Sequence, residues 1–138
     1  MIRAFVVLLA AASPVAAQVA PLSFDAGKSL QITPGQWDLV ATATGSEARY
    51  SAVLSIRCDR QTRTVTIRMP AQPAAALRIA TSTLTRELPA GGRLLANDPL
   101  LDALAFSRGR FLVSGGTGPV LAIPSWPEAA RAIEDCRN

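Results

Sequence analysis

The sequence offers few side chains that could carry out catalysis. It contains no histidine, and its two cysteines are Cys58 and Cys136. The remaining candidates are carboxylates, hydroxyl groups and Lys28. Asp98 and Asp102 have i,i+4 spacing, which on a helix would place both carboxylates on one face as a general acid–base pair. The alternative is that Asp98 caps a helix and Asp102 is solvated. The sequence favours this alternative, so we expect a protein that is not an enzyme.

Neither metal ligation nor phosphate binding is indicated by the other polar residues. Glu134 and Asp135 are adjacent, so on a helix their side chains point apart, and no histidine completes a metal site with the cysteines. Gly115, Gly116 and Gly118 resemble a phosphate-binding loop, but they precede a predicted strand, whereas such loops lead into the N-terminus of a helix. We therefore interpret these glycines as a hairpin turn and expect no cofactor and no metal.

Arginine is the residue type that gathers in one region. The formal net charge is +4, and aromatic residues make up only 5% of the chain, too few to provide stacking platforms, so we expect no nucleic-acid partner. The arginines could dock an anionic surface such as lipopolysaccharide or an acidic protein. Alternatively, arginines on the outside of a sheet discourage edge pairing. The candidate residues are Arg57, Arg60, Arg63 and Arg68 around a predicted hairpin, with Arg108 and Arg110 in a second small patch.

Both cysteines fall on faces that are predicted to be buried. Cys58 ends a strand in which Ala52, Leu54 and Ile56 share its face. Near the C-terminus, apolar residues recur at steps of three and four, which is typical of one face of a helix; they are Trp126, Ala129, Ala130, Ile133 and Cys136. The two patterns together predict a Cys58–Cys136 disulfide. A nucleophilic thiol or a metal-binding pair is the alternative, and either one lacks a histidine.

Two helices are predicted. Ser125 and Glu128 have the S-x-x-E spacing of a capping box, so the C-terminal helix is expected to begin at Ser125, with Trp126 and Ile133 filling the space beneath the disulfide. A shorter helix is expected to follow Asp98, a good N-cap that precedes Pro99 at the favoured first position. Its buried stripe would consist of Leu100, Leu101 and Leu104.

Alternating patterns predict about six short strands, over residues 36–41, 50–57, 63–69, 77–88, 110–114 and 120–123, with a further short extended stretch at 93–96. Short turns connect them, including a polar one at 44–47. We therefore predict the α+β class. The fold would be a small antiparallel β-sheet or sandwich, with a short helix and a C-terminal helix packed on it and one disulfide.

The first residues indicate export. A short basic stretch precedes the apolar run 4–12, and small residues at Val15 and Ala17 predict cleavage after Ala17. The alternative, a transmembrane anchor, would require about 20 apolar residues. We expect residues 1–17 to be a signal peptide, residues 18–34 an N-terminal arm, and residues 35–138 a single disulfide-stapled domain. The protein would then be periplasmic or extracellular, with no transmembrane segment after cleavage.

Parts of the chain resemble known groups of exported proteins. The stretches 98–111, 123–128 and 133–137 look like the C-terminal region of small exported proteins of alphaproteobacteria. In layout, the chain is similar to the invasion-associated locus B family. The shared features are a signal peptide, a Gly-x-Trp motif at the first strand (Gly35 to Trp37) and a late disulfide. Neither resemblance implies a catalytic residue.

These observations lead to two functional expectations. The first is a non-enzymatic periplasmic or secreted module that binds a protein or an anionic envelope component. Its surface would be the outer face of the 50–69 hairpin, with the arginines of 107–111 beside it. The alternative is an inhibitor of an exported protease, in which the 18–34 arm would occupy the active-site cleft. A hydrolase is a third and weaker alternative.

Overall fold

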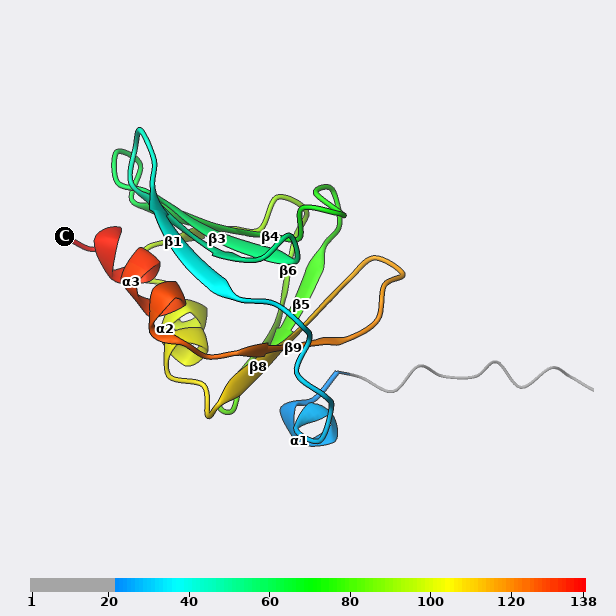
Figure 1. The fold of residues 1–138 in the computed structure, drawn as a ribbon. Helices are drawn as coiled ribbons and strands as arrows, with labels where there is room; N and C mark the ends of the chain where they lie inside the picture. Colours follow the sequence, from blue (N-terminus) through cyan, green and yellow to red (C-terminus); the bar gives the residue numbers. More distant parts are fainter. Residues whose placement is uncertain (1–21) are drawn as a thin grey trace, which may run out of the picture.

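The computed structural model describes residues 22–138, in which two antiparallel sheets enclose one core (Figure 1). The five-stranded sheet has the order β1-β2-β3-β4-β7 and the four-stranded sheet the order β6-β5-β8-β9. The strands are β1 Trp37–Ala41, β2 Ser46–Tyr50, β3 Leu54–Asp59, β4 Thr64–Arg68, β5 Leu77–Ala80, β6 Thr85–Leu88, β7 Arg93–Leu95, β8 Arg110–Gly115 and β9 Leu121–Pro124. The predicted signal peptide and residues 18–21 lie outside the described residues.

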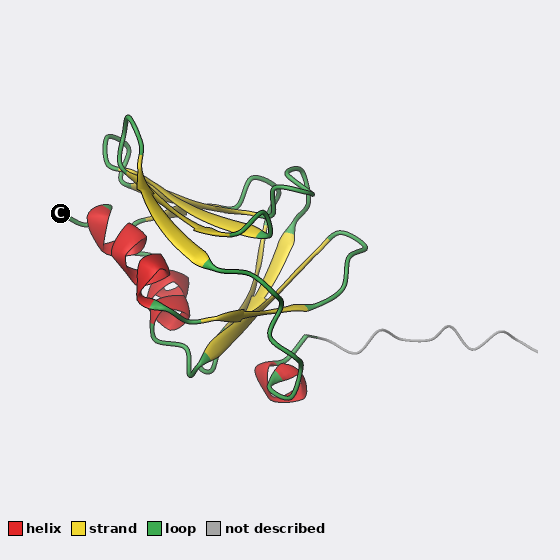
Figure 2. Ribbon diagram, viewed as in Figure 1, coloured by secondary structure: helices red, strands yellow, loops and turns green. Residues whose placement is uncertain are grey.

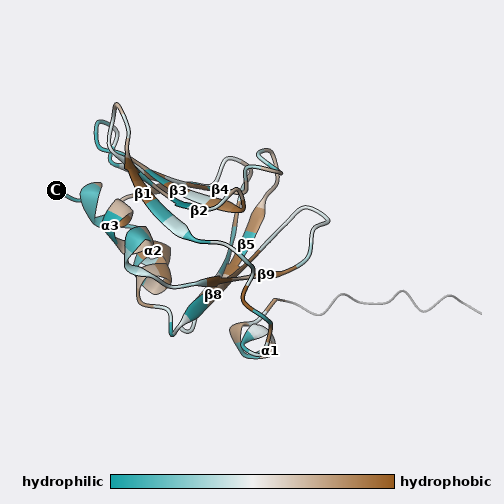
Figure 3. Ribbon diagram, viewed as in Figure 1, coloured by the Kyte–Doolittle hydropathy of each residue, from teal (hydrophilic) through white to brown (hydrophobic). Residues whose placement is uncertain are grey.

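Three helices accompany the sheets: α1 Phe24–Gly27, α2 Pro99–Ala105 and α3 Pro127–Asp135. Helices α2 and α3 pack on each other, and α3 also lies against β1, β2 and β3 (Figure 2). The strands contribute many of the most apolar segments, such as those in β5 and β9 (Figure 3). The predicted α+β class, with the C-terminal helix packed on an antiparallel sheet, is confirmed.

The predicted disulfide is also confirmed. Cys58 in β3 is bonded to Cys136 at the end of α3, and both residues are fully buried. Ile133, one turn earlier in α3, is buried as well. The strand alternation therefore correctly predicted that Cys58 is buried, and the helical spacing correctly predicted that Cys136 is buried. The bond joins the end of the last helix to the middle of the five-stranded sheet.

The strand boundaries differ from the prediction in three places. Residues 46–47, expected in a turn over 44–47, begin β2, and the described residues form nine strands rather than about six. Residues 50–57 do not form one strand, because a turn at residues 51–53 ends β2 at Tyr50 and leaves Ala52 exposed rather than inward. Ser51 adopts φ 47° in this turn. Residues 77–88 form a hairpin instead of one strand. The hydroxyl of Thr81 makes its turn by accepting the Leu84 N–H and donating to the Leu84 carbonyl, at 2.9 Å each.

The predicted capping box at the start of α3 is wrong. The N-cap is Trp126, in extended conformation and without a side-chain cap. Pro127 is the first helical residue, and a proline at that position fixes the cap at the residue before it. Ser125 instead follows the end of β9, and its N–H donates to the Gly109 carbonyl at 3.2 Å. Trp126 is 51% exposed and does not fill the space beneath the disulfide.

The described part of the N-terminal arm, residues 22–34, lies on the outer side of the four-stranded sheet. Its apolar side chains pack on a second, smaller cluster formed by Ala80, Leu112 and Ala122. Gly27 allows the close approach, because a Cβ at this position would lie 2.0 Å from Cδ1 of Leu112. At the end of the arm, the Thr33 N–H donates to the Ala122 carbonyl at 2.9 Å.

Candidate functional site

Four arginines lie on the outer face of the five-stranded sheet; Arg49 in β2 is paired with Glu47, and the other three form no ion pair within residues 22–138. Arg57 in β3 stands opposite Thr66 in β4, and Thr66 stands opposite Arg93 in β7, so the three residues form one row across the strands. Arg68 lies in the adjacent row, opposite Ser55. All three arginines are exposed. We call Arg57, Arg68 and Arg93 the arginine face.

Two threonine hydroxyls contact the guanidinium group of Arg93. Arg93 donates from Nε to the Thr64 hydroxyl at 3.3 Å and from Nη2 to the Thr62 hydroxyl at 3.5 Å. The two hydroxyls are hydrogen-bonded to each other at 2.7 Å. These bonds hold the Arg93 side chain along the sheet rather than letting it extend freely into solvent. The face therefore offers at least one cation whose position is fixed in advance.

Two carboxylates of this sheet, Glu47 and Asp59, have hydrogen-bond partners other than the arginine face, although Glu47 lies on the same outer face. Glu47 in β2 is buried and accepts from Arg49 at 2.8 Å, and this hydrogen bond, together with the negative charge of Glu47, raises the pKa of Arg49. Asp59 accepts the N–H groups of Gln61 and Thr62 in the following turn. Glu47 is also the cross-strand neighbour of Arg57, but they form no ion pair. Within residues 22–138, the ion pairs leave all three members of the arginine face without a carboxylate partner.

The other predicted arginines lie in different places. Arg60 and Arg63 belong to the turn between β3 and β4, where Arg60 pairs with Asp135 of α3 at 3.4 Å. Arg108 precedes β8 of the four-stranded sheet, and Arg110 is the first residue of that strand. There Arg110 donates to the Leu30 carbonyl and so holds the arm. The six predicted arginines therefore do not form one surface.

Arg93 was missed as a candidate. The sequence indicates a short extended stretch at 93–96 but contains no signal for its partner strand. β7 has three residues and pairs with β4, which is distant in the sequence. Only this non-local pairing brings Arg93 into the row with Arg57. The sequence pattern of the hairpin alone therefore identified two of the three members of the arginine face, Arg57 and Arg68.

The two carboxylates that were considered for acid–base chemistry have different partners at the start of α2. Asp98 is the N-cap of α2 and accepts the Leu100 N–H at 2.9 Å and Arg86 Nη2 at 2.8 Å. Burial acts to raise the pKa of Asp98, but these hydrogen bonds and the charge of Arg86 outweigh it and lower the pKa. Asp102 pairs with Arg137 at 2.8 Å. Neither geometry nor charge favours proton transfer, since a general acid requires a raised pKa.

Comparison with protein-family models, curated proteins and solved structures finds no match. The structure also contains, among its described helices, none with the length and apolar character needed to span a membrane.

Proposed function

We propose that this protein is a non-enzymatic, exported binding module that docks a phosphate-bearing surface of the cell envelope through the arginine face. The observation that carries the proposal is the set of three exposed guanidinium groups, supplied by three strands and without carboxylate partners in the part of the chain that the structure describes. Guanidinium groups bind phosphate oxygens through paired N–H donors, and the neighbouring threonine hydroxyls can add further donors.

The architecture suits docking on an extended surface. The face is formed by paired strands, so the separation between the guanidinium groups is set by the sheet rather than by a mobile loop. The opposite side of the same strands packs in the core, with Ile56, Val65 and Ile67 fully buried. Binding would therefore require little ordering of the backbone, which lowers its entropic cost.

Export belongs to the same proposal. The disulfide and the absence of a membrane-spanning helix from the described residues are compatible with a periplasmic or extracellular protein. We predict that the mature chain begins at Gln18. N-terminal sequencing of the protein recovered from the periplasmic or medium fraction checks this prediction. Recovery of the intact precursor in the membrane pellet would contradict it.

Charge reversal tests the docking face. In the double variant Arg57→Glu/Arg68→Glu, affinity for vesicles of phosphatidylglycerol and phosphatidylcholine is expected to fall roughly 30-fold or more. Each arginine near an anionic membrane contributes about 1 kcal/mol, and the new carboxylates add repulsion. Arg68→Glu should change stability by less than about 0.5 kcal/mol because the side chain is exposed, whereas Arg57→Glu should destabilise by up to about 1 kcal/mol because the new carboxylate stands opposite Glu47. Vesicle co-sedimentation at several salt concentrations measures the first effect, and thermal melting measures the second.

Arg108→Glu is the matched control. It reverses one exposed arginine just before β8 of the other sheet, half the charge change of the double variant, and we expect it to leave vesicle binding nearly unchanged. Salt-sensitive binding that persists in the double variant would refute the arginine face. If only Arg108→Glu lost binding, the docking surface would instead lie around Arg108. If wild-type protein did not bind the vesicles but bound an acidic protein, the envelope surface would not be the partner.

The protease-inhibitor alternative is not favoured by the arm. An inhibitory arm must be free to enter the cleft of a protease, whereas residues 22–34 are packed and hydrogen-bonded on the four-stranded sheet. Ala122 both donates to and accepts from Thr33, and the Tyr50 hydroxyl donates to the Thr33 carbonyl at 2.6 Å. Inhibition through this segment would first require these contacts to break.

A further inference from the structure

Strand β1 is an open edge of the five-stranded sheet. It pairs with β2 on one side, and no strand within residues 22–138 pairs with its other side. Such edges are bound by extended segments of other chains unless lysine, proline, a bulge or a covering segment protects them. The edge strand β9 of the other sheet is covered by the arm, through the hydrogen bonds between Thr33 and Ala122. Within the described chain, β1 has no such cover, contains neither lysine nor proline, and pairs with β2 in an uninterrupted register.

Backbone groups of β1 point out of this open edge. Just beyond the pair, the Thr42 N–H donates to the Gly45 carbonyl at 2.9 Å, so the backbone of Thr42 is turned toward β2. Alternate residues of an antiparallel strand bond with the same neighbour, so residues 38 and 40 bond with β2 and residues 39 and 41 face away from it. The N–H and C=O groups of Leu39 and Ala41 therefore face the open edge, and they have no hydrogen-bond partner among the described residues.

A groove of about 390 Å³ lies beside this edge, between β1 and α3. The strand and the helix contact each other and lie side by side (Figure 1). Leu39 and Ala41 line the groove from the strand, and Arg131 and Asp135 line it from the helix. Leu39 is half-buried and Ala41 is exposed, so both can be reached from solvent. An extended segment that pairs with β1 would place every second side chain over this groove.

The charges in the groove favour an acidic segment. Arg60 and Asp135 line one end and pair with each other at 3.4 Å. Arg131 is exposed and forms no ion pair in the described part of the chain. The groove therefore has an excess positive charge at Arg131. A carboxylate on an added strand would pair with it, whereas a lysine or arginine there would be repelled.

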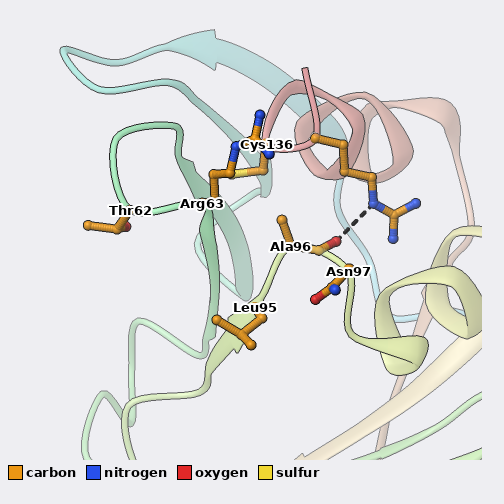
Figure 4. A pocket seen from close by; sticks show the side chains of 7 residues that line it. Thr62, Arg63, Leu95, Ala96, Asn97 and Cys136 are labelled. Atoms are coloured by element: carbon orange, nitrogen blue, oxygen red, sulfur yellow. Dashed lines mark hydrogen bonds between the residues drawn. The ribbon is translucent and has the colours of Figure 1, made fainter.

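The opposite edge of the same sheet is less suited to such pairing. β7 has three residues, so it offers a short stretch of backbone. The chain that follows it is tied to the turn between β3 and β4, because the Ala96 N–H donates to the Arg63 carbonyl at 2.9 Å. The pocket of about 300 Å³ beside β7 is bordered by Arg137, whose Nε donates to the Ala96 carbonyl at 2.8 Å (Figure 4). Of the two edges of this sheet, β1 is therefore the one that an additional strand fits.

We propose that β1 and α3 form a docking groove for an extended, acidic segment of a partner protein, which adds to the five-stranded sheet as a further strand. Hydrogen bonds to the backbone of Leu39 and Ala41 would supply affinity. An apolar side chain over Leu39 and a carboxylate at Arg131 would supply specificity.

The test is selection of peptides from a random phage-displayed library on the mature wild-type protein, followed by titration of the selected peptides by fluorescence polarisation. We expect sequences with alternating apolar residues and at least one carboxylate. In Ala41→Pro, the dissociation constant should rise at least about tenfold, because proline removes an N–H that faces the peptide and none that bonds with β2. Ala41→Ser is the matched control, since it changes the same side chain but keeps the N–H. Thermal melting checks that both variants are folded.

Arg131→Glu tests the charge of the groove separately. Affinity for the acidic peptides should fall at least about tenfold, and replacing the carboxylate residue of the peptide by lysine should restore binding to this variant. Arg108→Glu is the control, because it makes the same charge change at an exposed residue outside the groove. It should bind the peptides nearly as the wild type does.

Several results would overturn the proposal: no selected peptide that binds the wild-type protein, equal binding to Ala41→Pro and Ala41→Ser, or unchanged binding to Arg131→Glu. Light scattering tests a second copy of the chain as the occupant. A wild-type dimer that becomes monomeric in Ala41→Pro would show that the second copy binds this edge and would refute a partner protein. The proposal does not depend on the arginine face, so Arg57→Glu/Arg68→Glu should still bind the peptides. Loss of peptide binding in that variant alone would place the peptides on the arginine face and refute the groove.

Discussion

Replacement of Cys136 by serine is expected to lower the free energy of unfolding by about 2–5 kcal/mol. The disulfide joins residues separated by 78 positions, and cross-linking a loop of this length strongly restricts the unfolded chain. Small domains are stable by only about 5–15 kcal/mol, so a large share of the total would be lost. We therefore expect the variant to be exported but rapidly degraded.

The substitution isolates the covalent bond well. The Cys136 Sγ lies 3.2 Å from the Thr64 carbonyl, so a serine hydroxyl in its place has an acceptor within reach. The apolar contacts of α3 through Ala129, Ala132 and Ile133 remain. The helix should therefore form but dock less tightly on β2 and β3.

Urea unfolding of the variant, of oxidised wild type and of reduced wild type measures the loss. The variant and the reduced wild type should have similar midpoints, both well below that of the oxidised protein. A non-reduced digest should contain the Cys58–Cys136 peptide pair only in the oxidised wild type. Equal midpoints for all three samples would show that the bond does not stabilise the fold.

The features that the sequence predicted correctly are those determined by neighbouring residues. Strand alternation placed Cys58 inward, and helical periodicity placed Ile133 and Cys136 on one face. Asp98 and Pro99 marked the start of α2 because capping depends on adjacent residues. In these places, local propensity and tertiary packing agree, so a local pattern was enough.

The incorrect features depend on competition between signals or on non-local pairing. Ser125 had the capping-box spacing, but Pro127 at the first helical position moved the cap to Trp126 and turned that side chain toward solvent. Alternation across residues 50–57 predicted one strand and so missed the turn. Ser51 adopts a positive φ in this turn, and serine is not a residue type that indicates such a conformation. The arginine face required β7 to pair with β4, and no local pattern contains that information.

At the junction of the two sheets, Trp37 is expected to be the side chain whose removal lowers the free energy of unfolding most. It begins β1 in the five-stranded sheet, and its indole Nε1 donates to the carbonyl of Pro124, the last residue of β9 in the other sheet, at 2.8 Å. Its ring packs on that of Tyr50, with centroids 5.3 Å apart and an interplanar angle of 56°. Gly35 leaves room for Tyr50, since a Cβ there would lie 2.8 Å from the tyrosine ring.

Trp37→Ala is therefore expected to destabilise the protein by about 3–5 kcal/mol, the usual cost of deleting a large buried aromatic side chain. Trp37→Phe keeps most of the ring packing but leaves the buried Pro124 carbonyl without its donor, which should cost about 1–3 kcal/mol. Urea unfolding followed by circular dichroism measures both values. Trp126→Phe is the matched control, because Trp126 is 51% exposed and its replacement should change stability by less than about 0.5 kcal/mol. If Trp37→Ala were no more costly than Trp126→Phe, the indole would not be joining the two sheets.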